Sequence, residues 1–135
     1  MVTNPIIDSY YTQIIGNPIV GCIPTIKAGS SFSARWVIDG DVYQAGGVLS
    51  YGATNVFWRQ IRNFIIDLTA IPSTLQVAGI HWPTAQATSL QNIIIQMSKA
   101  TSTQHQGVFI ESGSGGFLTD LVFNGGAQGL VVDNQ

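Results

Sequence analysis

An internal repeat constrains the fold of this chain more than any other feature of its sequence. Three segments share one pattern: an aliphatic residue, a polar residue, Asn or Asp, three apolar residues, and a final amide or acid. They are Ile61–Asp67, Leu90–Gln96 and Leu118–Asn124, so the pattern recurs after 29 and then 28 residues. Self-similarity at such a period is typical of solenoids, whose coils bury their apolar side only by stacking on one another.

A second, shorter apolar segment recurs inside the same period. It occurs as Ala78–Trp82, Gln106–Ile110 and Gln128–Val132. In addition, Trp36–Asp39 precedes Phe64–Asp67 by 28 residues and resembles an earlier partial copy of the longer segment. The sequence therefore predicts an all-β fold, a right-handed parallel β-helix of a few coils, truncated in length. A β-sandwich, which also alternates strands and turns, is the alternative.

We expect one partial β-helix domain over residues 1–135. Residues 58–135 would supply about three repeated coils, and residues 1–57, which repeat less clearly, an irregular first coil or cap. The repeat also predicts a ladder of polar side chains at one register: Asn63, Asn92 and Asp120. A short β-helix exposes strand edges at its ends, so association of copies through those ends is expected.

Composition excludes several classes of partner. Charged residues make up only 9% of the chain and apolar residues 45%, with a formal net charge of −2. The basic residues are scattered, so nucleic acid is not an expected partner. No apolar run approaches the ~20 residues of a membrane span, so no membrane partner is expected. The composition suits an extracellular protein, although the first residues lack the pattern of a signal peptide.

Cysteine and histidine are too scarce to define a redox or metal site. Cys22 is the only cysteine, so it is expected to be either a buried thiol or one whose partner lies outside this chain. His81 and His105 are the only histidines, and no Cys or acidic spacing completes a metal site around them. We therefore expect no metal and no cofactor.

Five blocks of sequence resemble glycoside hydrolase family fifty-five. They are residues 9–18, 24–28, 55–67, 79–90 and 104–117. The resemblance implies part of the first β-helical domain of a secreted, fungal-type exo-β-1,3-glucanase that hydrolyses laminarin-like glucan with inversion. It also implies that the general-acid glutamate belongs to a second domain, and so has no counterpart here.

The same resemblance singles out candidate site residues. Gln104 and Gln106 would face one side of an extended segment, where their amides could position the attacking water or the substrate. An amide ladder between coils is the equally weighted alternative. Candidate sugar-binding residues are His81, Trp82, His105 and Glu111; Trp36 and Trp58 are more readily explained by core packing. The residues alone complete no catalytic set.

Two hypotheses about function remain open. The first is a fragment of a β-1,3-glucan hydrolase that is inactive alone because the general acid is missing. The second is a module without catalysis that binds β-glucan weakly or associates with itself.

Overall fold

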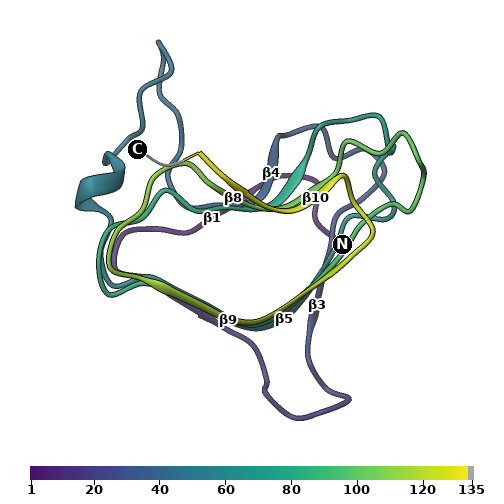
Figure 1. Ribbon diagram of the computed structural model, residues 1–135, viewed down its shortest axis with the longest axis horizontal. Coiled ribbons are helices and arrows are strands. Elements are labelled where there is room, and N and C mark those ends of the chain that lie inside the picture. Colours follow the sequence, from purple (N-terminus) through teal and green to yellow (C-terminus); the bar gives the residue numbers. More distant parts are fainter. Residues whose placement is uncertain (134–135) are drawn as a thin grey trace.

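The coils predicted from the repeat are present, and they stack into a parallel β-helix. The protein was analysed as a computed structural model, which describes residues 1–133. Viewed along the stack, successive coils overlie one another in a single outline with one sheet above and one below (Figure 1). The strands are β1 (Ile6–Ile7), β2 (Gln13–Ile15), β3 (Thr25–Lys27), β4 (Trp36–Asp39), β5 (Gln60–Asp67), β6 (Ala78–His81), β7 (Ser89–Gln96), β8 (Gln106–Ile110), β9 (Phe117–Asn124) and β10 (Gln128–Val132), with one 3-10 helix at Ala53–Asn55.

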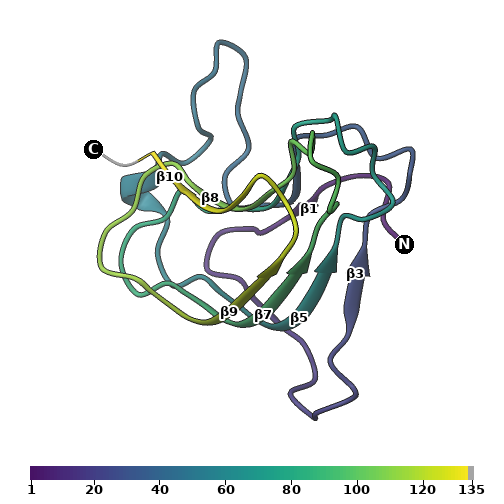
Figure 2. The same cartoon turned by 45° about the vertical axis from the view of Figure 1, so that its right-hand side comes forward.

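All pairing between these strands is parallel. One sheet has the order β1-β4-β6-β8-β10; the other has β2-β5-β7-β9, with β3 beside the second half of β5. Figure 2 shows β3, β5, β7 and β9 side by side. The long repeat is confirmed residue by residue, since Ile61 pairs with Leu90, which pairs with Leu118. Parallel order throughout rules out the β-sandwich alternative.

The shorter repeat is also confirmed, and the structure adds Trp36–Asp39 to it. Ala78 pairs with Gln106, and Gln106 with Gln128. Trp36–Asp39, expected to be a copy of Phe64–Asp67, instead pairs with β6 in the other sheet. The spacing misled because residues 40–55 leave the coil as a long excursion, which shifts every equivalent position that precedes it.

A ladder of polar side chains marks the middle of each long strand. Asn63, Asn92 and Asp120 have φ of 64°, 51° and 53°, a left-handed conformation that Asn and Asp tolerate better than most residues. The Asn92 amide donates to Asn63 Oδ1 at 2.9 Å, and the Asn63 amide donates to the Gly16 carbonyl at 3.1 Å. The register of the predicted ladder is thus confirmed, and hydrogen bonds join Asn63 to Asn92 and to Gly16.

A second left-handed column runs along the turn that precedes these strands. Its members are Tyr11, Trp58, Ala87 and Gly115, with φ between 56° and 66°. Each lies two residues before one of a set of mutually paired strand residues: Gln13, Gln60, Ser89 and Phe117. The column therefore carries large aromatic residues on its first two coils and small residues on the next two.

The core fills the space between the two sheets. Ile66 and Ile95 are fully buried in one sheet, and Ile80 in the other. Glycines in the β6-β8-β10 sheet make room for large residues opposite them: a Cβ on Gly107 would lie 2.5 Å from the Phe123 ring and 2.2 Å from the Gly129 carbonyl oxygen. Full burial of each such aliphatic side chain contributes roughly 1.5–3 kcal/mol, so stacked coils are the main source of stability.

Two excursions and the last coil depart from the regular stack. Residues 17–24 form the loop below the lower sheet in Figure 1, and the Cys22 thiol on that loop is exposed. The buried thiol expected as one alternative is therefore wrong. At the carboxyl end, several apolar side chains of β9 and β10 are exposed: Phe117, Leu118, Val122, Leu130 and Val132. Within residues 1–133, no helix has the length and apolar character that a membrane crossing requires.

Candidate functional site

The strand register brings three titratable side chains from successive coils together on the outside of the β1-β4-β6-β8-β10 sheet. Asp39 at the end of β4 pairs with His81 at the end of β6, and His81 pairs with Phe109 in β8. Glu111 follows Phe109 by two residues, just after β8 ends. Asp39 and Glu111 are 42 and 30 positions from His81 in the sequence, and they become its neighbours because equivalent strand ends stack.

The His81 ring lies between two carboxylates. Its Nδ1 is 2.8 Å from Asp39 Oδ1, and its Nε2 is 2.9 Å from Glu111 Oε2. The His81 side chain is fully buried, whereas those of Asp39 and Glu111 are 8% and 27% exposed. Because ionised carboxylates only accept hydrogen bonds, either the imidazole carries a proton on both nitrogens or one carboxyl group is protonated. Glu111 is the most exposed of the three side chains.

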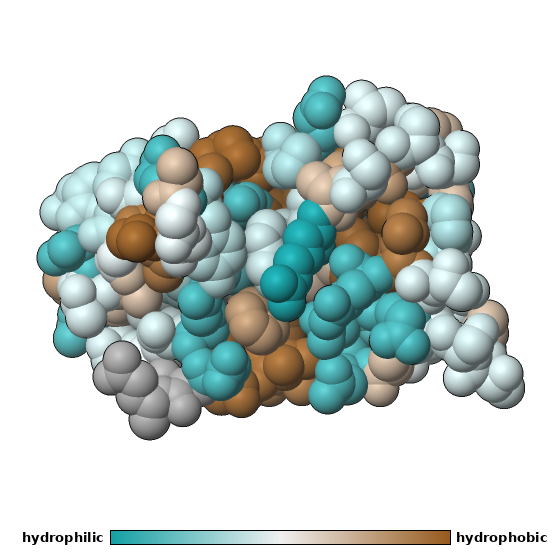
Figure 3. Space-filling view, turned by 90° about the horizontal axis from the view of Figure 1, so that it is seen from above, coloured by the Kyte–Doolittle hydropathy of each residue, from teal (hydrophilic) through white to brown (hydrophobic). Residues whose placement is uncertain are grey.

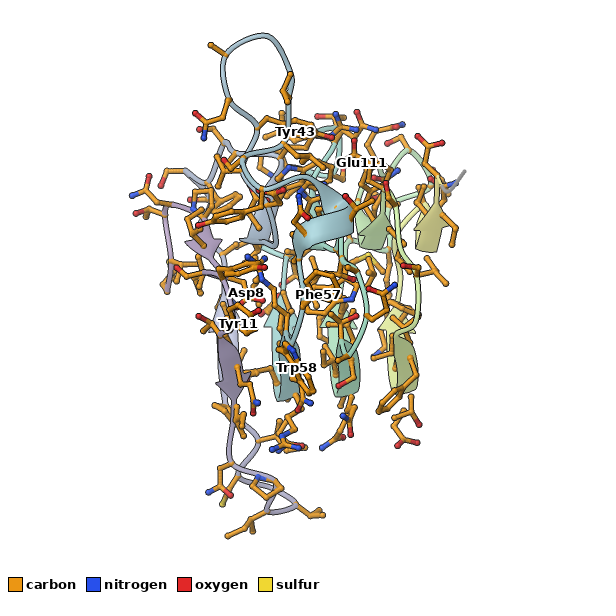
Figure 4. All side chains as sticks on the ribbon, turned by 90° about the vertical axis from the view of Figure 1, so that its left-hand side faces the viewer. Asp8, Tyr11, Tyr43, Phe57, Trp58 and Glu111 are labelled. Atoms are coloured by element: carbon orange, nitrogen blue, oxygen red, sulfur yellow. The ribbon has the colours of Figure 1, made fainter. Side chains whose placement is uncertain are left out.

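The excursion of residues 40–55 adds a fourth member. Tyr43 donates its hydroxyl to Glu111 Oε2, and its ring stacks over His81 with centroids 5.5 Å apart. Burial, together with the Glu111 carboxylate, holds the pKa of the Tyr43 hydroxyl above its ordinary value, so Tyr43 acts as a hydrogen-bond donor. Figure 4 shows Tyr43 and Glu111 beside each other at the top of the molecule.

Aromatic rings fix the remaining side of the imidazole. Trp36 stacks on His81 with centroids 4.4 Å apart and on Phe109 at 5.2 Å. The Arg35 guanidinium covers the Trp36 ring, 4.6 Å from its centroid. Viewed from above, this face mixes apolar and hydrophilic side chains (Figure 3). The rings and hydrogen bonds together hold Glu111 in one orientation.

The His81 imidazole separates the two carboxyl groups of this cluster. Inverting hydrolysis requires two carboxyl groups ~6.5–9.5 Å apart, with room for a water between them. Here the His81 imidazole occupies the space between Asp39 and Glu111, and Asp39 is almost inaccessible. The partly exposed Glu111 carboxylate can accept a hydrogen bond from a ligand hydroxyl. Within residues 1–133, no three His, Cys, Asp or Glu side chains are arranged so that they could hold a metal ion.

The other predicted site residues do not join this cluster. The Gln106 side chain is buried and donates to Gln128 Oε1 at 2.9 Å, as in the amide-ladder alternative, while Gln104 is exposed. His105 is fully buried, accepts from the Ser98 amide and contacts the Pro72 carbonyl oxygen. Burial lowers the pKa of His105, which favours the neutral ring.

The tryptophans also differ from expectation. Trp82, the tryptophan favoured for sugar stacking, is only 3% exposed and lines a hollow of about 190 Å³ at the carboxyl end of the stack. Trp36 is buried, as expected, although beside the site rather than between the sheets. The expectation that Trp58 packs in the core is wrong, since 58% of it is exposed.

A second group of buried charges adjoins the Glu111 cluster, since the Asp41 amide donates to Asp39 Oδ1 at 3.2 Å. Asp8, Asp41 and Arg59 are at most 1% exposed. Burial raises the pKa of Asp8 to about 7 and also raises that of Asp41, whose carboxylate accepts the amides of Tyr51 and Gly52. Within residues 1–133, both Asp8 oxygens and all three Arg59 side-chain nitrogens lack a hydrogen-bond partner.

Sequence reasoning identified His81 and Glu111 but missed Asp39 and Tyr43. Asp39 precedes Gly40, a composition typical of a turn, and Tyr43 lies in a segment that does not repeat. One signal for Asp39 was present in the sequence. The segments Trp36–Asp39 and Ala78–His81 both begin with an aromatic or apolar residue and end with a titratable one.

Comparisons with known proteins agree with this fold. All of residues 1–135 match a family model described as rhamnogalacturonase A/epimerase, pectate lyase-like. The whole chain is 45% identical to a glucan 1,3-beta-glucosidase of Cochliobolus carbonum and covers 17% of it. It is 47% identical to a probable glucan endo-1,3-beta-glucosidase of Arthroderma benhamiae, covering 15%. It is also 46% identical to the non-secreted LysM effector LysM15 of Penicillium expansum, covering 9%.

These relatives are much longer, since the chain spans between 9% and 17% of the length of each. The match to the family model nevertheless extends over the complete chain. The parallel coils, the Asn ladder and the sequence identity lead to one assignment: the chain belongs to the pectate-lyase-like β-helix family and is related to glucan 1,3-β-glucosidases.

Proposed function

We propose that this chain is part of a β-1,3-glucan hydrolase, in which it supplies a glucan contact through Glu111 but not the complete catalytic apparatus. The observation that carries the proposal is the partly exposed Glu111 carboxylate, fixed by His81 and Tyr43 on the outside of the coil. The names and 45–47% identity of the glucosidase relatives support glucan as the ligand class.

The arrangement of acids supports binding without turnover. All seven acidic residues lie within residues 1–133. Asp67 pairs with Lys27 and caps the turn at Thr69, and Asp120 accepts from Thr119. Asp8 and Asp41 are buried, and Asp39 is separated from Glu111 by the imidazole. The seventh acid, Asp133, is exposed and lies one coil beyond Glu111, since its amide donates to the Ile110 carbonyl. The cluster around His81 supplies no pair of accessible carboxyl groups such as inverting hydrolysis requires.

Action outside the cell belongs to the same proposal. Few charges and many neutral polar residues suit a polysaccharide ligand in an extracellular setting. The name of one relative does not support this location, because the Penicillium expansum protein is called a non-secreted effector. We therefore base the extracellular setting on the glucosidase relatives.

Laminarin provides the direct test. We expect no reducing sugar to be released by the chain, and calorimetry to show binding of laminarihexaose with a Kd of roughly millimolar order, as for a small, polar contact. Glu111→Gln is expected to weaken binding about tenfold, because a hydrogen bond to a charged group is lost. Asp120→Asn removes an equal charge from an exposed position in the other sheet and serves as the control.

Either half of the proposal can fail separately. Turnover comparable to that of a complete glucanase would contradict the absence of a catalytic set. Binding heat indistinguishable from dilution, or equal affinity in wild type and Glu111→Gln, would contradict the glucan contact.

A further inference from the structure

Three exposed aromatic side chains lie on the turn that precedes the β2-β5-β7-β9 sheet, and a fourth reaches them from the excursion of residues 40–55. Tyr10, Tyr11, Tyr51 and Trp58 are 36%, 58%, 47% and 58% exposed. Tyr10 stacks on Tyr51 with centroids 5.3 Å apart, and Tyr11 meets Tyr10 edge-on at 4.4 Å. We call these four residues the aromatic platform.

The register places Tyr11 beside Trp58. Gln13 pairs with Gln60, and the two aromatic residues each lie two positions earlier on adjacent coils. Figure 4 shows both on the same face, with Asp8 nearby. Both residues have a left-handed backbone, with φ of 56° and 58°. Bulky residues rarely adopt this conformation, and in the same column the next coils carry Ala87 and Gly115. The chain therefore holds two large rings outward at positions that favour small residues.

Buried charged groups without hydrogen bonds lie beside the platform. Arg59 follows Trp58 in sequence, is completely buried, and places its guanidinium 5.8 Å from the centroid of the Tyr51 ring. Its three side-chain nitrogens, like both oxygens of the buried Asp8, have no hydrogen-bond partner in residues 1–133. Asp8 and Arg59 attract each other electrostatically. Buried polar groups are normally also hydrogen-bonded, so donors and acceptors beside exposed rings indicate a site that a polar ligand or its bound water completes.

We infer that the aromatic platform is a second carbohydrate-binding surface, which takes a β-1,3-glucan chain across Tyr11 and Trp58. Flat ring faces match the C–H faces of pyranoses, and the tyrosine hydroxyls can bond the sugar hydroxyls at the ring edges. The excursion of residues 40–55 contributes Tyr43 to the Glu111 cluster and Tyr51 to the platform. The inference rests on the proposed function for its ligand class only.

Tryptophan fluorescence tests the platform directly, since Trp36 and Trp82 are 5% and 3% exposed and Trp58 is the exposed reporter. Laminarihexaose is expected to change the Trp58 emission. Trp58→Gly and Tyr11→Asn, which suit a positive φ and so preserve the fold, should each weaken binding about fivefold. Calorimetry measures these affinities, because Trp58→Gly removes the reporter. Trp58→Tyr should retain affinity. Phe117→Ala, at an equally exposed ring on the last coil, is the control and should leave affinity unchanged.

The outcomes separate this inference from the proposed function. The platform is overturned if Trp58→Gly and Tyr11→Asn bind laminarihexaose as tightly as wild type. If Glu111→Gln loses binding in the same experiment, the Glu111 contact is supported. Emission that responds to cellohexaose or chitohexaose but not to laminarihexaose would overturn the β-1,3-glucan assignment for the platform, while calorimetry with Glu111→Gln tests the Glu111 contact separately. Emission that responds to none of these sugars would overturn the platform as a carbohydrate site.

Discussion

Urea denaturation is expected to show that the protein loses stability as the pH rises from 4 to 7, and that Asp8→Asn removes most of this loss. Burial raises the pKa of Asp8 from its ordinary 3.8 to about 7. Between these values the folded chain binds a proton that the unfolded chain releases, so the free energy of unfolding falls with rising pH. At ~1.4 kcal/mol per pH unit, the loss amounts to at most about 4 kcal/mol.

Comparison of the two proteins isolates Asp8 from other titrations. His105 acts in the opposite direction, because its lowered pKa makes the unfolded chain bind more protons at low pH. Asp41 acts in the same direction as Asp8 but is present in both proteins. Asp133→Asn, at an exposed position, is the control and should preserve the wild-type profile. Parallel profiles for wild type and Asp8→Asn would show that Asp8 is ionised throughout this range.

Gly107→Ala is expected to lower the free energy of unfolding by about 3 kcal/mol, at the upper end of overpacking effects. The added Cβ would lie 2.2 Å from the Gly129 carbonyl oxygen on the next coil, a backbone atom that cannot rotate away. It would also lie 2.5 Å from the Phe123 ring. Relief of both contacts requires adjacent coils to separate, which weakens the stacking that stabilises the fold.

Gly113→Ala is the matched control for this substitution. Its nearest neighbours would be 3.6 Å from the new Cβ, an ordinary van der Waals distance, so we expect a change within about 0.5 kcal/mol. Chemical denaturation midpoints with an unchanged m-value provide the measurement. If Gly107→Ala and Gly113→Ala have the same midpoint, the coils do not stack as closely as described.

The architecture could be predicted from the sequence because stacking requires similar residues at equivalent positions of each coil, and this requirement produces the repeat. Stacked coils place like residues above one another, so Asn63 and Asn92 recur in the sequence and bond in space. The same logic located β5, β7 and β9. It failed at Trp36–Asp39, because the excursion of residues 40–55 makes the spacing from Asp39 to His81 42 residues rather than the regular 28. A search for a constant period does not detect a coil whose length differs from the others.

The site was only half predictable for a related reason. His81 and Glu111 are 30 residues apart, close to one period, so their proximity follows from stacking. Tyr43 reaches Glu111 from a segment without a repeat, and its position depends on tertiary contacts alone. The emphasis on Gln104 and Gln106 came from the family resemblance, whereas the structure places Gln106 in an amide contact with Gln128. Likewise, only the backbone conformation shows that Trp58 points outward.

The most direct test of the central claim, a glucan contact at Glu111, is amide NMR of the chain titrated with laminarihexaose. Glu111 lies on the outside of the coil between the His81 ring and the Tyr43 hydroxyl, so the amides of these three residues should shift together and saturate with one Kd. Shifts confined to other surfaces, such as the hollow beside Trp82, or a spectrum that the sugar does not change, would contradict it.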